Sequence, residues 1–366
     1  MTKDINKIPK EITQVNNSFN QTHNLNTTSS SPKKYNNTKT KNLDLNKDNN
    51  IINTIFYSLT LFCYLGTACM MLTLGSYWKD LEEHIPDNYK LPEYKDFYIT
   101  LKFLPVFIII KLLFEKYVPQ YMYILLSKKY KNPNDINNFN LGNFYKKKLA
   151  TNLLKVIYYT FISIFAYCVM KESDFFPYEL LGKGDMWNIF SKGVPGYLFF
   201  EKPDYFNYYY LIGLAFVITD LIWLLFIYEK QSDFPLMLLH HSVTISLVVF
   251  SYLFNCSQIG VIVFILHDYT DIFVYITRIA INTDLKDIYK YIICGVFLAL
   301  YIYLRLYVLG KLIISCFIVN TYWGIPQISL WSFKNFLIIM HVYWVYQIII
   351  RFFYKSITDV GKVKQK

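Results

Sequence analysis

The sequence predicts an all-α polytopic membrane protein with about eight transmembrane helices. Hydrophobic residues make up 54% of its 366 residues and the mean hydropathy is +0.24, although the first 50 residues are almost entirely polar. The rest of the chain is therefore more apolar than an average globular protein, in which about 45–50% of residues are apolar even when Gly is counted. Most of its apolar runs have the roughly 20 residues that a bilayer-spanning helix needs. Lys and Arg gather in three stretches outside these runs.

Eight apolar runs divide the chain. They lie near residues 53–75, 99–118, 151–170, 207–228, 236–254, 259–280, 289–316 and 332–352. The stretch before them contains twelve Asn and few apolar residues, so it cannot bury enough apolar surface to offset the entropy of ordering it. The domains that we expect are a disordered Asn- and Lys-rich tail over 1–50, two N-terminal transmembrane helices with their loops over 51–144, six transmembrane helices in one domain over 145–355, and a basic tail over 356–366.

The basic residues predict the orientation of the chain in the membrane. Residues 1–50 contain eight Lys and four acidic residues, residues 127–148 six Lys and one Asp, and residues 351–366 five cations and one Asp. Eight spans place all three stretches on one side, which the positive-inside rule makes cytoplasmic. Both termini are then cytoplasmic, and the four tail sequons stay unglycosylated; these are Asn16, Asn20, Asn26 and Asn36. A nucleic-acid surface would need its basic residues on a folded domain, so we expect no nucleic-acid partner.

Polar residues inside two neighbouring runs predict a functional site. An ionisable group in a spanning helix is costly and by default marks a site. His241 and Asp271 each lie fifteen residues from the turn expected near Cys256, which places both about 22 Å from it at 1.5 Å per residue. The run before the turn contributes His240, His241, Thr244, Ser251 and Asn255, and the run after it His267, Asp268, Asp271, Tyr275 and Arg278. Imidazoles and carboxylates thus converge in the cytoplasmic half of one helical hairpin.

Three other interpretations of these residues remain open. Single buried polar groups often serve only as hydrogen bonds between transmembrane helices. A membrane di-iron centre needs more His than the four that lie in apolar runs, whereas a single zinc site stays possible on ligand type. A channel or transporter would be expected to have discontinuous helices or repeat symmetry, and neither is evident.

The six Cys lie mostly inside apolar runs without CxxC spacing, which indicates packed side chains rather than a disulfide framework or metal site.

Residues 238–280 resemble the core motif of ceramide synthases, the longevity-assurance family of the TLC-domain superfamily. The resemblance lies in the order of a His pair, SY and Asn, Gly, and finally HD-x-x-D. Weaker matches extend it over about 145–355, among them the Tyr-Leu-Arg at 303–305 and the His-Val-Tyr-Trp at 341–344. The sequence departs from the family pattern at Gln258, Tyr275 and Arg278, which concerns substrate contacts more than the type of reaction.

This resemblance implies a TLC-type bundle of six helices that transfers a fatty acyl group from acyl-CoA to the amine of a sphingoid base in the endoplasmic reticulum membrane. Acyl-CoA is then a co-substrate, and no permanently bound cofactor or metal is expected. Membrane lipids surround the protein, and a homodimer, a heterodimer or a small accessory subunit is conceivable. A lipid-binding, lipid-sensing or translocation-associated TLC protein without catalysis remains the alternative.

The resemblance and the chemistry of imidazole together suggest residue roles. The expected catalytic set is His240, His241, His267, Asp268 and Asp271, and the expected substrate-binding set is Thr244, Ser251, Asn255, Tyr275, Arg278, Asp220 and Arg305. In this scheme His240 attacks the thioester or acts as base, and Asp271 orients His241. Asp220 and Arg305 form a pair or contact the head group, Val248, Ile262 and Phe264 line an acyl slot, and His341 is a packed histidine. The loop 319–330 resembles in position the segment that influences acyl-chain choice in the family.

Overall fold

The computed structural model describes the backbone of residues 33–87, 89–126, 128, 136–192, 196–228, 233–319 and 325–363. Side chains are described between residues 51 and 350, except at 88, 127, 129–141, 193–195, 197, 229–232 and 319–327. The chain forms two compact units, residues 1–52 and 53–366. The second unit contains every side chain discussed below. The expectations for the tail sequons and for the loop 319–330 fall largely outside the described residues.

The described residues form α-helices joined by short 3₁₀ turns, with no strand among them. The longer elements are α2 (Lys33–Glu82), α3 (Tyr98–Tyr117), α5 (Ile136–Met170), α6 (Phe206–Phe226), α7 (Phe234–Leu253), α8 (Ser257–Ile281), α9 (Asp287–Tyr301), the π-helical segment η6 (Ile302–Val308), α10 (Leu309–Val319) and α11 (Ile325–Val363). The short ones are η1 (Tyr94–Phe97), α4 (Pro119–Met122), η3 (Tyr178–Leu180), η4 (Met186–Phe190) and η5 (Gly196–Leu198).

Eight of the described helical stretches are long and apolar enough to cross a membrane. They are Ile51–Glu82, Tyr94–Tyr117, Gly142–Met170, Phe206–Phe226, Phe234–Leu253, Ser257–Ile281, Asp287–Ile318 and Ile328–Ile350. The predicted all-α polytopic fold is therefore confirmed, and α9, η6 and α10 together make one span. Helix α2 already begins at Lys33, inside the stretch for which we expected no structure. Extending an existing helix needs no new nucleus, which explains why the helix continues N-terminal to its apolar part.

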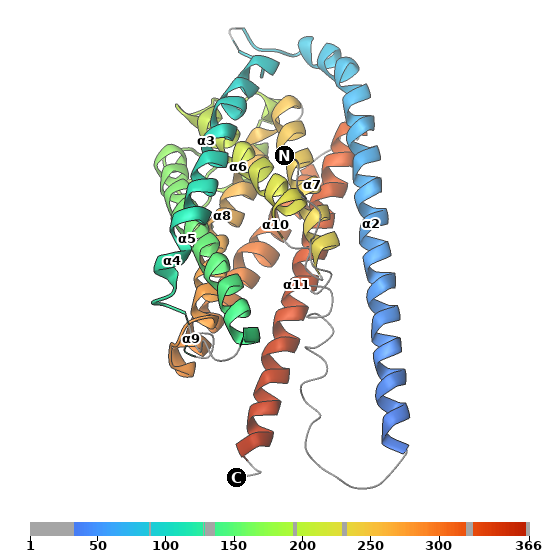
Figure 1. The fold of residues 1–366 in the computed structure, drawn as a ribbon. Helices are drawn as coiled ribbons and strands as arrows, with labels where there is room; N and C mark the ends of the chain where they lie inside the picture. Colours follow the sequence, from blue (N-terminus) through green and yellow to red (C-terminus); the bar gives the residue numbers. More distant parts are fainter. Residues whose placement is uncertain are drawn as a thin grey trace, which may run out of the picture. The chain divides into compact units, whose positions relative to one another are not determined.

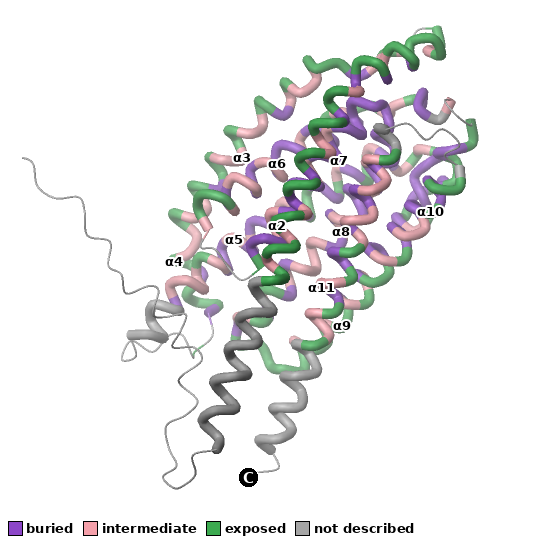
Figure 2. Tube along the Cα trace, turned by 90° about the vertical axis from the view of Figure 1, so that its right-hand side faces the viewer, coloured by how far each residue is buried: buried purple, intermediate pink, exposed green. Residues whose placement is uncertain are grey.

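The helices α6, α7 and α8 lie inside the bundle of the second unit. Buried residues make up 67% of the apolar window of α7, 56% of that of α6 and 50% of that of α8, but only 17% in the first span and 11% in the second. Figure 1 shows α7 and α8 among the other helices, and Figure 2 shows that their traces are largely buried while α3 is largely exposed. Helix α5 packs on α8, α6 on α7, and α11 on α7. Large exposed apolar side chains cover the outer helices, as a lipid-facing surface requires.

The turn between α7 and α8 is fixed by Asn255. This residue has a φ of 56°, a left-handed conformation that Asn tolerates better than most other non-Gly residues. Its side-chain nitrogen donates to the carbonyl of Leu198 at 2.7 Å and contacts the Tyr89 hydroxyl at 2.9 Å. Burial raises the pKa of Tyr89, so its hydroxyl stays protonated at neutral pH. These hydrogen bonds fix the turn of the α7–α8 hairpin. The turn lies near Cys256, as the sequence predicts.

A glycine allows the close approach of α8 to α6 and α7. A Cβ at Gly260 would lie 2.0 Å from the Tyr210 hydroxyl oxygen and 2.9 Å from the Ser251 hydroxyl oxygen. Tyr210 is fully buried, and its hydroxyl bonds to that of Ser251 at 2.5 Å. Because the rigid ring has no room to move away, only Gly fits at this crossing.

We predict that Gly260→Ala lowers the stability of the bundle by about 1–3 kcal/mol, the usual cost of overpacking a core. The midpoint of thermal unfolding of the detergent-solubilised protein measures the effect. Gly295→Ala is the matched control, because a Cβ at Gly295 meets no atom within 4 Å. Equal midpoints for the two variants would contradict the packing argument.

Candidate functional site

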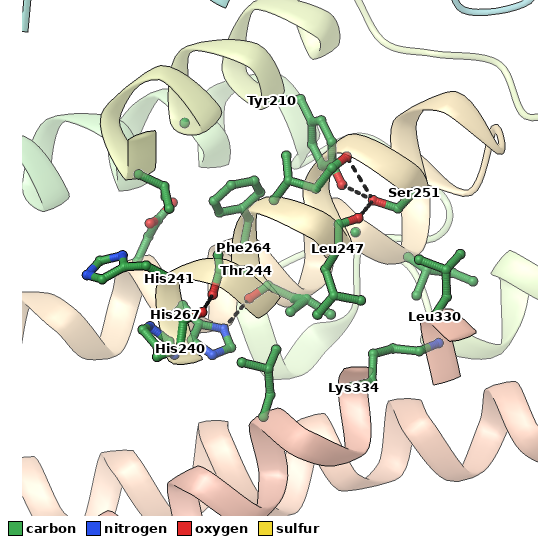
Figure 3. A pocket seen from close by; sticks show the side chains of 18 of the residues that line it. Tyr210, His240, His241, Thr244, Leu247, Ser251, Phe264, His267, Leu330 and Lys334 are labelled. Atoms are coloured by element: carbon green, nitrogen blue, oxygen red, sulfur yellow. Dashed lines mark hydrogen bonds between the residues drawn. The ribbon is translucent and has the colours of Figure 1, made fainter. Parts of the chain in front are cut away.

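A cavity between α6, α7, α8 and α11 gathers most of the polar residues singled out in the sequence. Its volume is about 120 Å³, many times the roughly 10–15 Å³ that one water molecule needs. Its lining includes eight of the expected site residues, namely His240, His241, Thr244, Ser251, His267, Asp268, Asp271 and Asp220. Figure 3 shows the three imidazoles at one end and Ser251, Leu330 and Lys334 at the other. Between them lie apolar side chains, including Leu247, Val248 and Phe264.

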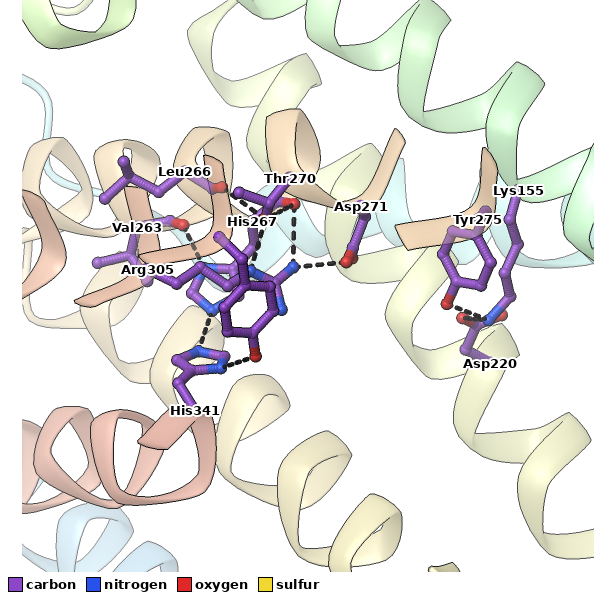
Figure 4. A network of polar contacts seen from close by, with 11 residues as sticks. Lys155, Asp220, Val263, Leu266, His267, Thr270, Asp271, Tyr275, Arg305 and His341 are labelled. Atoms are coloured by element: carbon purple, nitrogen blue, oxygen red, sulfur yellow. Dashed lines mark hydrogen bonds and ion pairs between the residues drawn. The ribbon is translucent and has the colours of Figure 1, made fainter. Parts of the chain in front are cut away.

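Asp220 is held by two lysines from different helices. The Lys111 ammonium on α3 and the Lys155 ammonium on α5 both donate to its carboxylate, the second at 2.8 Å. Lys155 also donates to the Tyr275 hydroxyl at 3.1 Å, as Figure 4 shows. Lys111 and Asp220 are only 2% and 5% exposed. Two buried cations therefore share one carboxylate beside the cavity, and this cluster ties α3, α5 and α6 together.

Asp271 has a different partner from the one expected. Arg305 donates to its carboxylate at 2.5 Å, and also to the Thr270 hydroxyl and to the carbonyl of His267. Arg305 lies in η6, where the backbone departs from regular α-helix, and such π-helical segments often occur at functional sites. Figure 4 shows the guanidinium reaching across to α8. The expected orientation of His241 by Asp271 is not observed, because Arg305 donates to the Asp271 carboxylate and Nδ1 of His241 has no partner among the described residues.

His267 belongs to a linear chain of hydrogen bonds in which both of its ring nitrogens have a partner. Its Nδ1 lies 2.6 Å from the Val263 carbonyl, its Nε2 lies 2.8 Å from Nε2 of His341, and Nδ1 of His341 lies 2.8 Å from the Tyr301 hydroxyl. A carbonyl only accepts, so Nδ1 of His267 carries a proton. In the neutral ring Nε2 then accepts from His341, whose Nδ1 accepts from Tyr301. Both ring nitrogens of His267 are occupied, so this residue positions the site rather than acting as a free base.

The neighbouring residues His240 and His241, by contrast, each have a ring nitrogen without a described hydrogen-bond partner. Within the described part of the chain, Nδ1 of each ring is buried and has no hydrogen-bond partner. The two ring centroids lie 5.5 Å apart, and the ring of His240 also packs on Trp344 at 5.2 Å. Buried polar groups are nearly always paired, so an unpaired one needs an explanation. Two imidazoles that line one cavity thus each have a ring nitrogen available to a ligand.

Asp268 is a carboxylate of the cavity lining without a cationic partner among the described side chains. It accepts a hydrogen bond from the Tyr209 hydroxyl at 2.7 Å, and no ion pair to it is found among the described side chains. The two other carboxylates that line the cavity, Asp220 and Asp271, each have a cationic partner. A cationic ligand would therefore meet its countercharge at Asp268.

Other expected site residues do not line the cavity. Asn255 is part of the hairpin turn, Tyr275 accepts from Lys155 outside the lining, and Arg278 is exposed. Arg305 and Asp220 do not pair with each other. Of the expected acyl-slot residues, Val248 and Phe264 line the cavity, whereas Ile262 is buried elsewhere.

Four further residues at the site are not among those expected from the sequence, namely Lys111, Lys155, Tyr301 and Lys334. All four are polar residues inside apolar runs, and the two lysines that hold Asp220 could have been found by asking where intramembrane cations lie. His341 is fully buried, as expected of a packed histidine, but it also hydrogen-bonds to His267 and Tyr301. These partners come from helices distant in the sequence, so no local pattern indicates them.

Comparison with known proteins identifies the fold. A family model for the TLC domain matches residues 148–350. The chain belongs to the TLC-domain family. The TLC domain thus contains α6 to α10 with η6, and most of α5 and α11, and with them the imidazoles and the cavity.

Several curated relatives of this TLC domain are named after one activity. Ceramide synthase hyl-2 of Caenorhabditis elegans is 27% identical over 215 residues, which are 58% of this chain and 61% of that protein. Ceramide synthase 5 of Mus musculus is 32% identical over 147 residues, or 39% and 35% of the two chains. Sphingosine N-acyltransferase lac1 of Schizosaccharomyces pombe is 26% identical over 217 residues, or 55% and 53%. The alignments thus cover about a third to three-fifths of each relative, and the resemblance noted in the sequence is confirmed.

We predict that Arg305→Met destabilises the TLC domain strongly, by about 3–5 kcal/mol, because removing one partner of a buried ion pair leaves the other charge uncompensated. The double variant Arg305→Met with Asp271→Leu removes both charges and should recover most of this loss. Thermal unfolding in detergent measures both effects.

The control for this prediction is Lys183→Met, which breaks the exposed pair between Lys183 and Glu172 and should change the midpoint little. A double variant as unstable as Arg305→Met would mean that Arg305 acts through its bonds to Thr270 and His267 rather than through Asp271.

Proposed function

We propose that this TLC-domain protein is a ceramide synthase, which transfers a fatty acyl group from acyl-CoA to the amine of a sphingoid base. The observation that carries the proposal is the cavity itself, in which two unpaired imidazoles and one carboxylate without a cation face an apolar slot. The names of the relatives support the same reaction. The resemblance to ceramide synthases favours the endoplasmic reticulum membrane, and the distribution of basic residues favours a cytoplasmic location of both termini.

The two open imidazoles supply the chemistry of acyl transfer. A nitrogen of His240 attacks the thioester carbon, the C–S bond breaks, and CoA leaves as the thiolate. The amine of the sphingoid base then attacks the acyl-imidazole, the new C–N bond forms, and His240 is released. His241 takes the proton that the amine loses, since imidazole is the side chain whose unperturbed pKa suits this task near neutral pH. His267 and His341 hold the neighbouring helices in place through their chain of hydrogen bonds.

Asp268 is assigned to the ammonium of the sphingoid base. The base enters protonated, and a protonated amine is not a nucleophile. Asp268 offers the one lining carboxylate without a described cation, whereas Asp220 and Asp271 are already neutralised by Lys111, Lys155 and Arg305. Lys111 and Lys155 together carry one positive charge more than Asp220 compensates, and this surplus opposes a further positive charge, which favours loss of the proton once the amine is bound.

The slot beyond the imidazoles takes the acyl chain. Leu247, Val248, Phe264 and Leu337 line it, and apolar walls with few polar groups are typical of lipid-binding cavities. Lys146, Lys147 and Lys148 lie near the start of the third span. On the cytoplasmic side they are suited to contact the phosphates of CoA, although Lys146 and Lys148 also pack over Tyr123 and Phe144.

We predict that His240→Ala and His241→Ala each reduce N-acyltransferase activity at least about 100-fold, the lower range of what a positioned acid–base group contributes. Purified protein is given a sphingoid base and acyl-CoA, and the N-acylated product is identified by mass. His84→Ala is the matched control, because His84 is exposed at the end of the first span. Near-normal turnover in either cavity variant, at equal amounts of inserted protein, would overturn the catalytic assignment. Lipid binding without any turnover in the parent protein would instead favour the non-catalytic alternative.

We predict that Asp268→Asn raises the KM for the sphingoid base about 10- to 100-fold and leaves the KM for acyl-CoA nearly unchanged. The amide loses a hydrogen bond between two charged groups, which contributes about 1.5–3 kcal/mol. Initial rates at varied concentrations of each substrate separate the two constants. Tyr209→Phe is the control, since it removes the described donor to Asp268 but keeps the carboxylate. Equal rises in both KM values would contradict a role specific to the amine.

A further inference from the structure

Lys334 is a buried cation at the far end of the cavity. It lies on α11, its side chain is 8% exposed, and it lines the cavity together with Leu330 and Leu337 from the same helix. Figure 3 shows its side chain extending toward Leu330, away from the imidazoles. None of the catalytic steps proposed above uses this group.

The ammonium of Lys334 has no countercharge among the described residues, which contribute neither a hydrogen bond nor an ion pair to it. Cys256 lies near it and also lines this end of the cavity. Burial raises the pKa of Cys256 to about 12, so its thiol is neutral. The hydroxyl of Ser251 is bonded to Tyr210 and to a carbonyl of its own helix.

The sequence excludes an acidic partner from the nearest undescribed stretch. Residues 319–327, which lead into α11, contain no Asp or Glu. An ammonium in a bilayer-spanning helix is costly unless it has hydrogen-bond partners, and Lys334 faces the cavity, so water or a ligand in the cavity can bind it.

The position of Lys334 defines how long an acyl chain bound at His240 must be to reach the ammonium. It lies seven residues before His341, about 10 Å along the helix at 1.5 Å per residue. Helical side chains lean toward the N-terminus, which carries the ammonium further from the imidazoles. On the facing helix α7, His240 and Ser251 are eleven residues apart, about 16 Å. An acyl chain with its carbonyl at His240 therefore comes level with Lys334 after roughly 10–16 Å.

We propose that Lys334 selects acyl chains by their length and by whether the distal end carries an oxygen that can bind the ammonium. A chain that ends in a methyl group is accepted only if it stops short of Lys334, where water can still hydrate the charge. A longer chain is accepted when its distal carbon carries a hydroxyl or carboxyl oxygen that binds the ammonium. This inference deepens the proposed acyltransferase function and depends on it.

The physical reason is the difference in solvation between the two chain ends. A methyl end that reaches Lys334 displaces water from the ammonium and offers no hydrogen bond in return. An oxygen at the same place replaces the lost water. Sites that hold an unpaired polar group discriminate strongly against a ligand that cannot satisfy it.

The experiment compares product distributions of the full-length protein. The protein is given one sphingoid base and a mixture of plain saturated acyl-CoA species of increasing length, with the matched ω-hydroxyacyl-CoA species in a second mixture. Products are separated by mass. Lys334→Met is the test variant, Lys334→Arg keeps the charge, and Asn335→Met is the matched control. Asn335 is the next residue on α11, does not line the cavity, and bonds to its own helix.

We expect Lys334→Met to raise the ratio of long to short plain products about tenfold or more, as a pocket that no longer rejects the longer ligand should. The parent, Lys334→Arg and Asn335→Met should keep the shorter distribution and prefer ω-hydroxy chains among the longest substrates. An unchanged distribution and unchanged ω-hydroxy preference in a monodisperse Lys334→Met protein would overturn the inference and leave the proposed function intact. Failure of every form, the parent included, to produce an N-acylated lipid would overturn the proposed function and this inference with it.

Discussion

A charge inside a lipid-embedded bundle needs an opposite charge close by, and the core of this protein contains two clusters that provide one. The first joins Lys111, Lys155 and Asp220, and so links α3, α5 and α6. The second joins Arg305 to Asp271, and so links η6 to α8. Leaving one of these charges unpaired would cost several kcal/mol. Both clusters therefore restrain helices that surround the cavity.

The hydrogen-bond and ion-pair partners of the buried polar groups also distinguish supporting residues from reactive ones. His267, His341 and Tyr301 satisfy one another, and Asp220 and Asp271 are neutralised. His240, His241 and Asp268 are left without a complete set of partners inside the described cavity. Other buried polar atoms without a described partner, such as Nδ2 of Asn152 and Oγ1 of Thr277, lie outside the cavity lining, whereas those of His240 and His241 lie together within it. Such local violations of polar satisfaction are where function is expected.

The sequence was sufficient for the fold and for the convergence of the site, but not for the partners within it. The apolar runs and the equal spacing of His241 and Asp271 from the turn predict eight spans and one polar hairpin, since both follow from helix rise and bilayer thickness. Which cation meets which carboxylate depends on how distant helices cross, and nothing in a single sequence records that. Lys111 lies 109 residues from Asp220 and Arg305 lies 34 from Asp271. The π-helical segment that positions Arg305 has no sequence signal of its own, whereas the equal distance of Asp271 and His241 from the turn predicts that these two residues meet.

The cavity is polar at both ends, and this polarity fixes how a substrate can lie in it. Carboxylates and imidazoles from α6, α7 and α8 occupy one end, a single ammonium from α11 occupies the other, and the walls between them are apolar. A cationic amine is attracted to the first end and repelled by the second, because the same field that favours it at Asp268 opposes it at Lys334. An apolar chain is tolerated only between the two. The orientation of a lipid in this cavity is therefore set by its charged groups before any shape complementarity is considered, with the head at the imidazoles and the tail directed toward the α7–α8 turn.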